Sequence, residues 1–336
     1  MHRAGRLFEA AVSFPSLLSA FRMAFRGSRR TAEACAFHFQ LESELIGLKR
    51  HLEAGTYRPR PYRYFRIREP KERTVSVASF RDRVVHHAVV GILEPIYERR
   101  FIHHSYATRK AKGTHRAVLA GQRFLRRYPF YLKADIEKYF ESIDHGVILS
   151  QLEKAVKDDR LLSLIEVIVR NNDVSLGKAD GKGLPIGNLT SQFFANVYLN
   201  EFDHFVLEKI RAGPYIRYMD DFVIFSDRKA SLLEARNAIR VYLEKYLCLK
   251  LKEKATFINR GTNGLSFLGF RIFPNLLRLK RENVGRLRRK LAFRRYEFEA
   301  GIISEEKFRQ SLASLFGHLE FLNSFRLRAS CLANNG

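Results

Sequence analysis

Two short apolar segments joined by a pair of aspartates constrain the fold of this chain more than any other feature. Residues 215–219 and 222–226 are rich in aromatic and aliphatic side chains, and only Asp220-Asp221 separates them. This pattern is typical of a β-hairpin. Asn-Gly or Asp-Gly would suit such a turn better, because those residues accept positive φ. Since adjacent carboxylates repel, a bound divalent cation explains the pair better than the fold alone does.

The segments around this hairpin predict an α+β domain. In chain order we expect a strand (131–136), helical segments (to about 169), a glycine-rich loop (177–187), a helix (about 189–210), the hairpin, a helix (230–247) and a strand (249–258). Apart from the insert after the first strand, this order is β-α-β-β-α-β, the split βαβ pattern. The loop fits neither G-x-x-x-x-G-K-[ST] nor G-x-G-x-x-G, which argues against those two nucleotide-binding motifs.

A third carboxylate is expected beside the hairpin. Asp135 ends the first predicted strand, and its neighbours Leu132 and Ile136 indicate burial. In a split βαβ fold that strand lies next to the hairpin, so three carboxylates converge at one end of the sheet. Two-metal phosphoryl transfer needs such a cluster, with metals about 3.5–4 Å apart. For Asp135 alone, a capping or ion-paired aspartate is the alternative.

The charge of the chain points to a polyanionic partner. It holds 60 Lys and Arg against 35 Asp and Glu, a net charge of +25. Nucleic acid is the expected partner, because basic side chains displace counterions from phosphates. Two basic segments stand out: residues 58–73, which prolines keep from being helical, and residues 286–295, which lack acids. A solvated edge strand is the alternative for the first. The candidate nucleic-acid-binding residues are Arg63, Arg66, Arg286, Arg288, Arg289 and Lys290.

Several features limit the class of protein. No apolar run approaches the ~20 residues of a membrane span, so we expect no membrane partner. The three cysteines (Cys35, Cys248 and Cys331) are widely spaced, which favours a reducing cytoplasm over a disulfide framework. His86-His87 has no acidic or cysteine partner at metal-ligand spacing, so surface or packing roles are expected.

Several motifs resemble those of reverse transcriptases, in the order found in that family. The matching segments are residues 67–73 and 79–85 (the fingers of bacterial, group II intron-like members), 133–145 (the first metal-binding motif), 217–222 (Arg-Tyr-Met-Asp-Asp-Phe, the family signature) and 267–270 (the primer grip). They cover about residues 57–275. The resemblance implies an RNA-directed DNA polymerase that uses dNTPs and binds template RNA and the cDNA/RNA duplex.

The resemblance also implies a right-hand polymerase fold and a metal site. Its expected parts are an N-terminal helical segment (1–56), fingers (57–130), a ferredoxin-like palm (131–274, with a fingers insertion at about 146–186) and a short basic helical thumb (275–336). The implied catalytic residues are Asp135, Asp220 and Asp221. The same residues and the adjacent Ile136 are the implied ligands of two Mg²⁺ ions, with Mn²⁺ as the alternative metal. The implied primer grip is Phe267, Leu268, Gly269 and Phe270.

By position, further residues are expected to bind the nucleotide. Phe140 stands where the family places a steric gate against the ribose 2′-hydroxyl, with a core phenylalanine as the alternative. Lys71 and Arg73 match the residues that grip the triphosphate. Lys254 is the candidate for the palm lysine near the pyrophosphate, with Lys252 as the alternative.

One segment narrows the family. Residues 183–192 place Ile186 where group II intron and retroviral enzymes usually have Gln, and end on Ser191-Gln192. This pattern resembles the reverse transcriptases of diversity-generating retroelements. That class copies a template-repeat RNA into adenine-mutagenised cDNA for retrohoming, with a basic, pentameric accessory variability protein. It would place the protein in the cytoplasm, encoded by a bacterium or a phage.

Ile186 cannot form a side-chain hydrogen bond, so weaker nucleotide selectivity is the corresponding hypothesis. A core-filling role is its alternative. Gln192 either faces the template or caps the loop. Other functions left open are a retron, antiphage-defence or intron-derived reverse transcriptase and a non-catalytic RNA-binding scaffold. Phe140, as a steric gate, argues against an RNA-dependent RNA polymerase.

Overall fold

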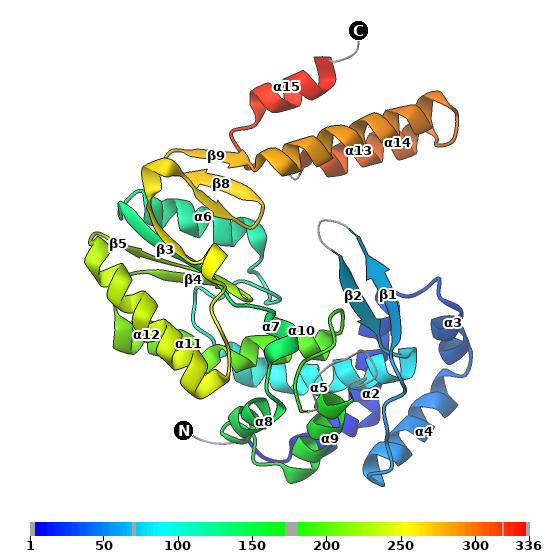
Figure 1. Ribbon diagram of the computed structural model, residues 1–336. Coiled ribbons are helices and arrows are strands. Elements are labelled where there is room, and N and C mark those ends of the chain that lie inside the picture. Colours follow the sequence, from blue (N-terminus) through cyan, green and yellow to red (C-terminus); the bar gives the residue numbers. More distant parts are fainter. Residues whose placement is uncertain (1–3, 69–71, 172–180, 318, 334–336) are drawn as a thin grey trace. The chain divides into compact units, whose positions relative to one another are not determined.

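The computed structural model describes residues 4–68, 72–171, 181–317 and 319–333 (Figure 1). The chain divides into two compact units, each assembled from three separate segments. Unit 1 comprises Met1–His103, Ile136–Ile210 and Asn237–Lys252, and unit 2 comprises His104–Asp135, Arg211–Arg236 and Glu253–Gly336. Within the described residues, no helix has both the length and the apolar character needed to cross a bilayer.

Unit 1 begins with four helices, as expected for residues 1–56. They are α1 (Leu7–Val12), α2 (Phe14–Arg26), α3 (Ala32–Phe39) and α4 (Leu41–Glu53). In α4, Leu45, Leu48 and Leu52 are buried, which explains the three- and four-residue spacing of its leucines. The long helix α5 (Phe80–Glu98) packs against α2 and α10. This apolar contact makes α5 the centre of unit 1.

The basic extended segment forms a two-stranded antiparallel ribbon. Its strands are β1 (Arg63–Ile67) and β2 (Arg73–Val77), and β1 is exposed at four of its five positions. The extended conformation expected from the prolines is therefore confirmed.

Asp82 in the first turn of α5 anchors the chain that leads into the ribbon. Its buried carboxylate accepts hydrogen bonds from the Tyr57 hydroxyl (2.7 Å), the Ser79 hydroxyl (2.7 Å) and the Arg60 amide (3.0 Å). A buried carboxylate with three donors is well compensated for its lost hydration. These hydrogen bonds fix the segment that precedes the ribbon to the start of α5.

The remaining regular elements that the structure describes in unit 1 are helical. It contains α7 (Tyr139–Ser142), α8 (His145–Glu153), α9 (Asp159–Arg170), α10 (Leu189–Tyr198), α11 (Asn200–Phe205) and a π-helical turn (Val206–Ile210). The prediction of one helix over about 189–210 is wrong, because the α-helix breaks at Leu199. Leu199, Phe202 and Val206 are all buried, so the apolar spacing continues across the break and conceals it.

Unit 2 contains the predicted four-stranded antiparallel sheet. Its strands are β3 (Phe130–Asp135), β4 (Tyr215–Tyr218), β5 (Asp221–Ser226) and β6 (Phe257–Arg260), in the order β4-β5-β3-β6. This is the split βαβ order, and helix α12 (Lys229–Leu247), which begins in unit 2 and continues into unit 1, follows the hairpin as expected. The last strand begins at Phe257 and not at residue 249, because a 3₁₀ turn (Glu253–Ala255) interrupts the extended chain.

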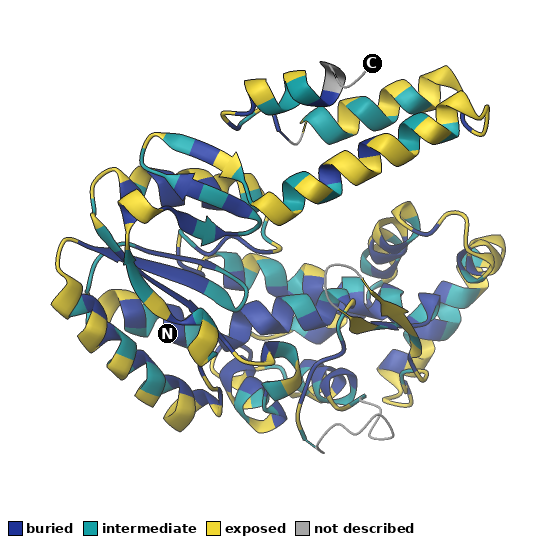
Figure 2. Ribbon diagram, turned by 45° about the horizontal axis from the view of Figure 1, so that its top comes forward, coloured by how far each residue is buried: buried dark blue, intermediate teal, exposed yellow. Residues whose placement is uncertain are grey.

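A second sheet completes the core of unit 2. It consists of β7 (Leu265–Phe267), β8 (Phe270–Phe273) and β9 (Leu276–Leu279). Helix α6 (Thr114–Leu125) packs against both β4 and β8, so the two sheets share one apolar core. Beyond β9 the chain forms the helices α13 (Arg281–Glu299), α14 (Glu305–Gly317) and α15 (Phe325–Ala333). Most residues of α13 and α14 are exposed or half-buried (Figure 2).

We predict that a buried histidine makes the fold sensitive to acid. His86 in α5 is buried, and burial lowers the pKa of its ring from 6.5 to about 3. Because folding depresses this pKa, the stability contribution of the neutral ring is present above pH 6.5 and is lost as pH falls. Between pH 7 and pH 5 this loss amounts to about 2 kcal/mol.

His86→Leu removes the ring, so its free energy of unfolding should fall by about 2 kcal/mol less than that of the wild type over this pH range. Denaturant unfolding at the two pH values measures the difference. His51→Leu, at an exposed position, should follow the wild type. Equal losses in wild type and His86→Leu would contradict the prediction.

Candidate active site

The turn between β4 and β5 carries the first two candidate carboxylates. Tyr218 pairs with Asp221, so the two turn residues are Met219 and Asp220, and Asp221 begins β5. The expectation that Asp220-Asp221 forms the connection is therefore wrong by one residue. Met219 takes the left-handed conformation (φ 55°), and the buried Arg217 donates a hydrogen bond to the Met219 carbonyl (3.2 Å). This contact stabilises a turn without Gly or Asn.

The sheet register brings the third carboxylate alongside. Asp135 is the last residue of β3 and pairs directly with Asp221 across the antiparallel ladder. Paired residues in such a ladder have Cα atoms about 4.5–5.5 Å apart. Asp220 precedes Asp221 on the turn, so all three carboxylates lie at one end of the sheet, and each residue is half-buried. Among the described residues, no three His, Cys, Asp or Glu side chains are grouped closely enough to hold a metal ion as they stand.

A lysine that the sequence did not single out lies within this cluster. The Lys133 ammonium is 2.8 Å from Asp221 Oδ1, and only 11% of the lysine side chain and 20% of the aspartate side chain are exposed. Lys133 shares a face of β3 with Asp135, two residues on. A lysine in an otherwise apolar strand was the available signal, but its partner is 88 residues away in sequence.

The electrostatics of Asp221 show that the charges act on one another. Burial raises the pKa of Asp221 to about 6, Lys133 opposes this rise, and the negative charges of Asp135 and Asp220 add to it. The three aspartates supply carboxylate oxygens, which are the donors that Mg²⁺ prefers. The donor chemistry of Asp135, Asp220 and Asp221 thus suits a divalent metal ion.

In unit 1, main-chain hydrogen bonds join Phe140 to the loop that precedes α10. The Leu184 amide donates to the Phe140 carbonyl (2.7 Å), and the Gly183 amide donates to the Ile143 carbonyl (2.7 Å). The Phe140 ring is half-buried and lies 5.7 Å from the Tyr139 ring, between centroids. The candidate steric gate is therefore held beside this loop.

The same loop is bound at its other end to the ribbon. The Ser76 amide donates a hydrogen bond to the Ile186 carbonyl (2.7 Å). The Asn188 side-chain amide donates to the Ser76 carbonyl and its oxygen accepts from the Ala78 amide (3.3 Å each). Between them, Gly187 adopts φ +112°, and a Cβ there would lie 2.6 Å from Val75 Cγ1. Glycine is thus required for the loop to approach β2. Phe140, Ile186 and β2 belong to one hydrogen-bonded assembly.

The remaining nucleotide-binding candidates are more dispersed. Arg73 is exposed at the start of β2, and Gln192 is half-buried in the first turns of α10. In unit 2, Lys254 is exposed on the 3₁₀ turn that contacts β3, whereas Lys252, at the end of unit 1, is half-buried. Lys71 lies outside the described residues.

Comparison with known proteins decides the family. The family model for reverse transcriptase (RNA-dependent DNA polymerase) matches residues 67–272, more than half of the chain. This chain belongs to the reverse transcriptase family. It is thus identified as an RNA-directed DNA polymerase. Protein YkfC of Escherichia coli K12 is 28% identical to this reverse transcriptase over 317 residues, which cover 82% of the chain and 79% of YkfC.

Two further similarities concern the class and the fold. The group II intron-encoded protein LtrA of Lactococcus lactis is 24% identical over 298 residues, which cover 69% of this chain and 50% of LtrA. The structure of apo telomerase from Candida tropicalis matches 66% of this chain and 48% of its own, with a TM-score of 0.51 at 12% identity. The reverse transcriptase thus spans about half the length of both. The expected right-hand polymerase fold is confirmed.

The predicted primer-grip segment, residues 267–270, forms the tight turn between β7 and β8. Leu268 and Gly269 both have positive φ (50° and 87°), and the flanking Phe267 and Phe270 pair and are buried. The Gly269 carbonyl accepts hydrogen bonds from the side chain of Asn283 (2.9 Å) and the amide of Lys280 (3.0 Å). The turn is therefore fixed to the start of α13.

The predicted nucleic-acid-binding residues lie on two exposed elements. On the ribbon, the Arg63 guanidinium forms a salt bridge with the Glu33 carboxylate (2.8 Å between N and O). The Arg66 guanidinium nitrogen lies 3.7 Å from a carboxylate oxygen of Glu72. On α13, the buried face carries Leu287 and Leu291. The basic residues Arg288, Arg289 and Lys290 are exposed, and Arg286 and Lys290 line a cavity of about 420 Å³. These positions suit contact with a phosphate backbone.

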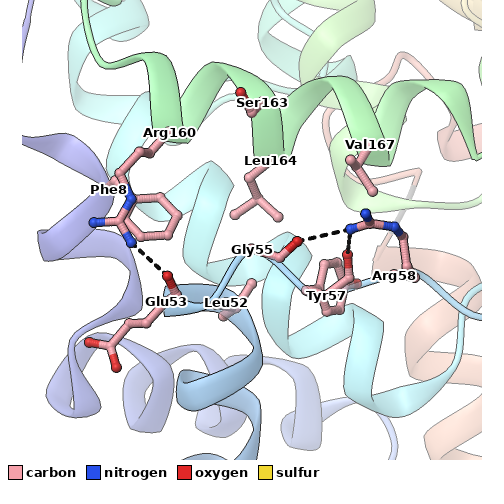
Figure 3. A pocket seen from close by; sticks show the side chains of 10 residues that line it. All are labelled: Phe8, Leu52, Glu53, Gly55, Tyr57, Arg58, Arg160, Ser163, Leu164 and Val167. Carbon is pink, nitrogen blue, oxygen red and sulfur yellow. Dashed lines mark hydrogen bonds between the residues drawn. The ribbon is translucent and has the colours of Figure 1, made fainter.

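A separate cavity of about 170 Å³ lies between α9 and the chain that follows α4 (Figure 3). Arg160 covers the Phe8 ring at one end, 4.1 Å from its centroid, and donates to the Glu53 carbonyl (2.9 Å). At the other end Arg58 donates to the carbonyls of Gly55 (3.0 Å) and Tyr57 (2.7 Å). None of the described candidate site residues lines this cavity.

Gly187→Ala tests the close approach of the loop to β2. The alanine Cβ would overlap Val75 and lie 3.0 Å from the Ser76 carbonyl oxygen. We expect it to lower the free energy of unfolding by about 3 kcal/mol, from positive φ and overlap together. Gly181→Ala is the matched control, because Gly181 has φ +70° with no atom within 4 Å of the added Cβ. It should cost about 1 kcal/mol. Equal losses in denaturant unfolding would refute the predicted overlap.

Proposed function

We propose that this reverse transcriptase copies RNA into DNA at Asp135, Asp220 and Asp221, with two Mg²⁺ ions and with Mn²⁺ as an alternative. The observation that supports this best is the direct pairing of Asp135 with Asp221 beside the turn that carries Asp220. Metals bound there would lower the pKa of the primer 3′-hydroxyl and offset charge on the leaving pyrophosphate. The carboxylates position that chemistry at the end of a rigid sheet.

The other candidate residues have roles that follow from their charge and place. Arg73, with Lys71 and Lys254, would offset charge on the dNTP triphosphate, since fixed cations stabilise the developing leaving group. Phe140 would exclude a ribose 2′-hydroxyl. In this proposal the helical segment (1–56), fingers (57–130), palm (131–274) and thumb (275–336) take the parts expected from the sequence, and α13 follows the phosphate backbone of the duplex.

Asp220→Asn should remove primer extension. The amide keeps the size of the side chain but cannot supply an anionic ligand, so the rate should fall by about a thousandfold. The assay is extension of a DNA primer on an RNA template with dNTPs and Mg²⁺, with the product sequenced.

Asp227→Asn is the matched control, because Asp227 is exposed just beyond the opposite end of β5. It should retain wild-type extension. Full activity in Asp220→Asn, or none in the wild type even with an accessory partner and RNA supplied, would favour the non-catalytic scaffold.

We further propose that the enzyme belongs to the diversity-generating class and makes adenine-mutagenised cDNA for retrohoming in the cytoplasm, with a basic, pentameric accessory protein. The support is Ile186, whose carbonyl is bound by Ser76 while its side chain has no polar atom. Selection of the incoming nucleotide would then depend more on base pairing and shape. Similarity to the group II intron-encoded LtrA favours the competing intron-derived function. Under that alternative, the enzyme would copy RNA accurately.

Ile186→Gln should restore selectivity. A glutamine at this position can hydrogen-bond the incoming nucleotide, so misincorporation opposite template adenines should fall about fivefold to tenfold. Single-nucleotide incorporation on an RNA template measures this ratio.

Ile186→Leu is its control and should keep the wild-type ratio, because leucine is also apolar. Accurate synthesis by the wild type would favour an intron-derived, retron or antiphage-defence function over the diversity-generating one. An unchanged ratio in Ile186→Gln would remove the role given to this side chain.

A further inference from the structure

Lys133 places a fixed positive charge inside the carboxylate cluster. Its ammonium lies 2.8 Å from Asp221 Oδ1, and both side chains are largely shielded from solvent. Main-chain pairing fixes both residues, because Lys133 is opposite Val223 and Asp221 is opposite Asp135. The ion pair is therefore built into the sheet.

This charge occupies part of the site that a divalent cation would use. The ammonium takes one oxygen of Asp221, so a metal ion approaching the same carboxylate meets a positive charge a few ångströms away. At that separation and in partly buried surroundings the repulsion is several times stronger than in bulk water. The same lysine also offsets the mutual repulsion of Asp221, Asp135 and Asp220 when no metal is bound.

We propose that Lys133 is a positioning residue that weakens divalent-cation binding to the substrate-free palm. Firm metal binding would then require the phosphate oxygens of the dNTP and the primer as additional ligands. Mg²⁺ sites commonly combine one or two carboxylates with substrate phosphates, which is the chemistry that this requires. The inference rests on the proposed function of the three aspartates.

The effect of removing the charge has an opposite sign in the two explanations of Lys133. If the lysine only supports the local structure, its loss disorders the carboxylates and weakens metal binding. If it competes with the cation, its loss strengthens metal binding to the substrate-free protein. Affinity for a metal ion in the absence of RNA, primer and dNTP therefore separates the two explanations.

The test titrates Mn²⁺ alone into the full-length, substrate-free protein and follows free Mn²⁺ by electron paramagnetic resonance. Lys133→Met should bind Mn²⁺ about tenfold more tightly than the wild type, whereas Lys133→Arg, which keeps the charge, should match it. Adding Asp220→Asn to Lys133→Met should abolish the gain, which assigns it to the palm carboxylates. In primer extension, Lys133→Met should reach its half-maximal rate at a lower Mg²⁺ concentration.

Lys229→Met is the matched control, because it removes the same charge from an exposed position beyond the far end of β5. It should bind Mn²⁺ as the wild type does. Lys133→Gln repeats the test with a polar side chain, and circular dichroism checks that each variant is folded. Unchanged or weaker Mn²⁺ binding in both folded Lys133 variants overturns the inference. That result leaves the proposed function intact as long as Asp220→Asn is inactive.

Discussion

The candidate site depends on the antiparallel register between β3 and β5. Pairing of Tyr131 with Phe225 places two buried rings on the same face of the sheet as Asp135 and Asp221. A slip of one residue would turn the side chains of the displaced strand to the opposite face of the sheet. That face is also buried, by residues such as Leu132 and Ile224, so the slip would force the rings into packed space and would separate the carboxylates. Packing of the core therefore also aligns the polar end of the strands.

Local patterns in the sequence were sufficient to predict the elements of this sheet. The hairpin, the strand that ends at Asp135 and the β-α-β-β-α-β order are each encoded by apolar segments and the connections between them. The break at Leu199 was missed because buried residues continue the apolar pattern through it. The late start of the last strand was missed because Leu249 and Leu251 alternate with lysines, which is typical of a strand. The positive φ of Met219 was also missed, since its stabilising contact comes from the side chain of Arg217.

The chemistry of the site was only partly accessible in the same way. The residue type and the position at a strand end or a turn were enough to predict all three aspartates as site residues. Lys133 could not, because its ion pair with Asp221 exists only once two distant strands are in register. The same holds for Asn188, which reaches Ser76 and Ala78 across 112 and 110 residues of sequence.

The loop that ends at Asn188 has a consequence for how such an enzyme can change. The hydrogen bonds that attach it to β2 and to the segment after β3 use main-chain atoms and the Asn188 amide, and among the described residues none of these bonds involves the side chain of Ile186. Different side chains at this one position would therefore sit on the same scaffold. In the proposed function, a substitution at this position would change copying accuracy without rebuilding the fold around it.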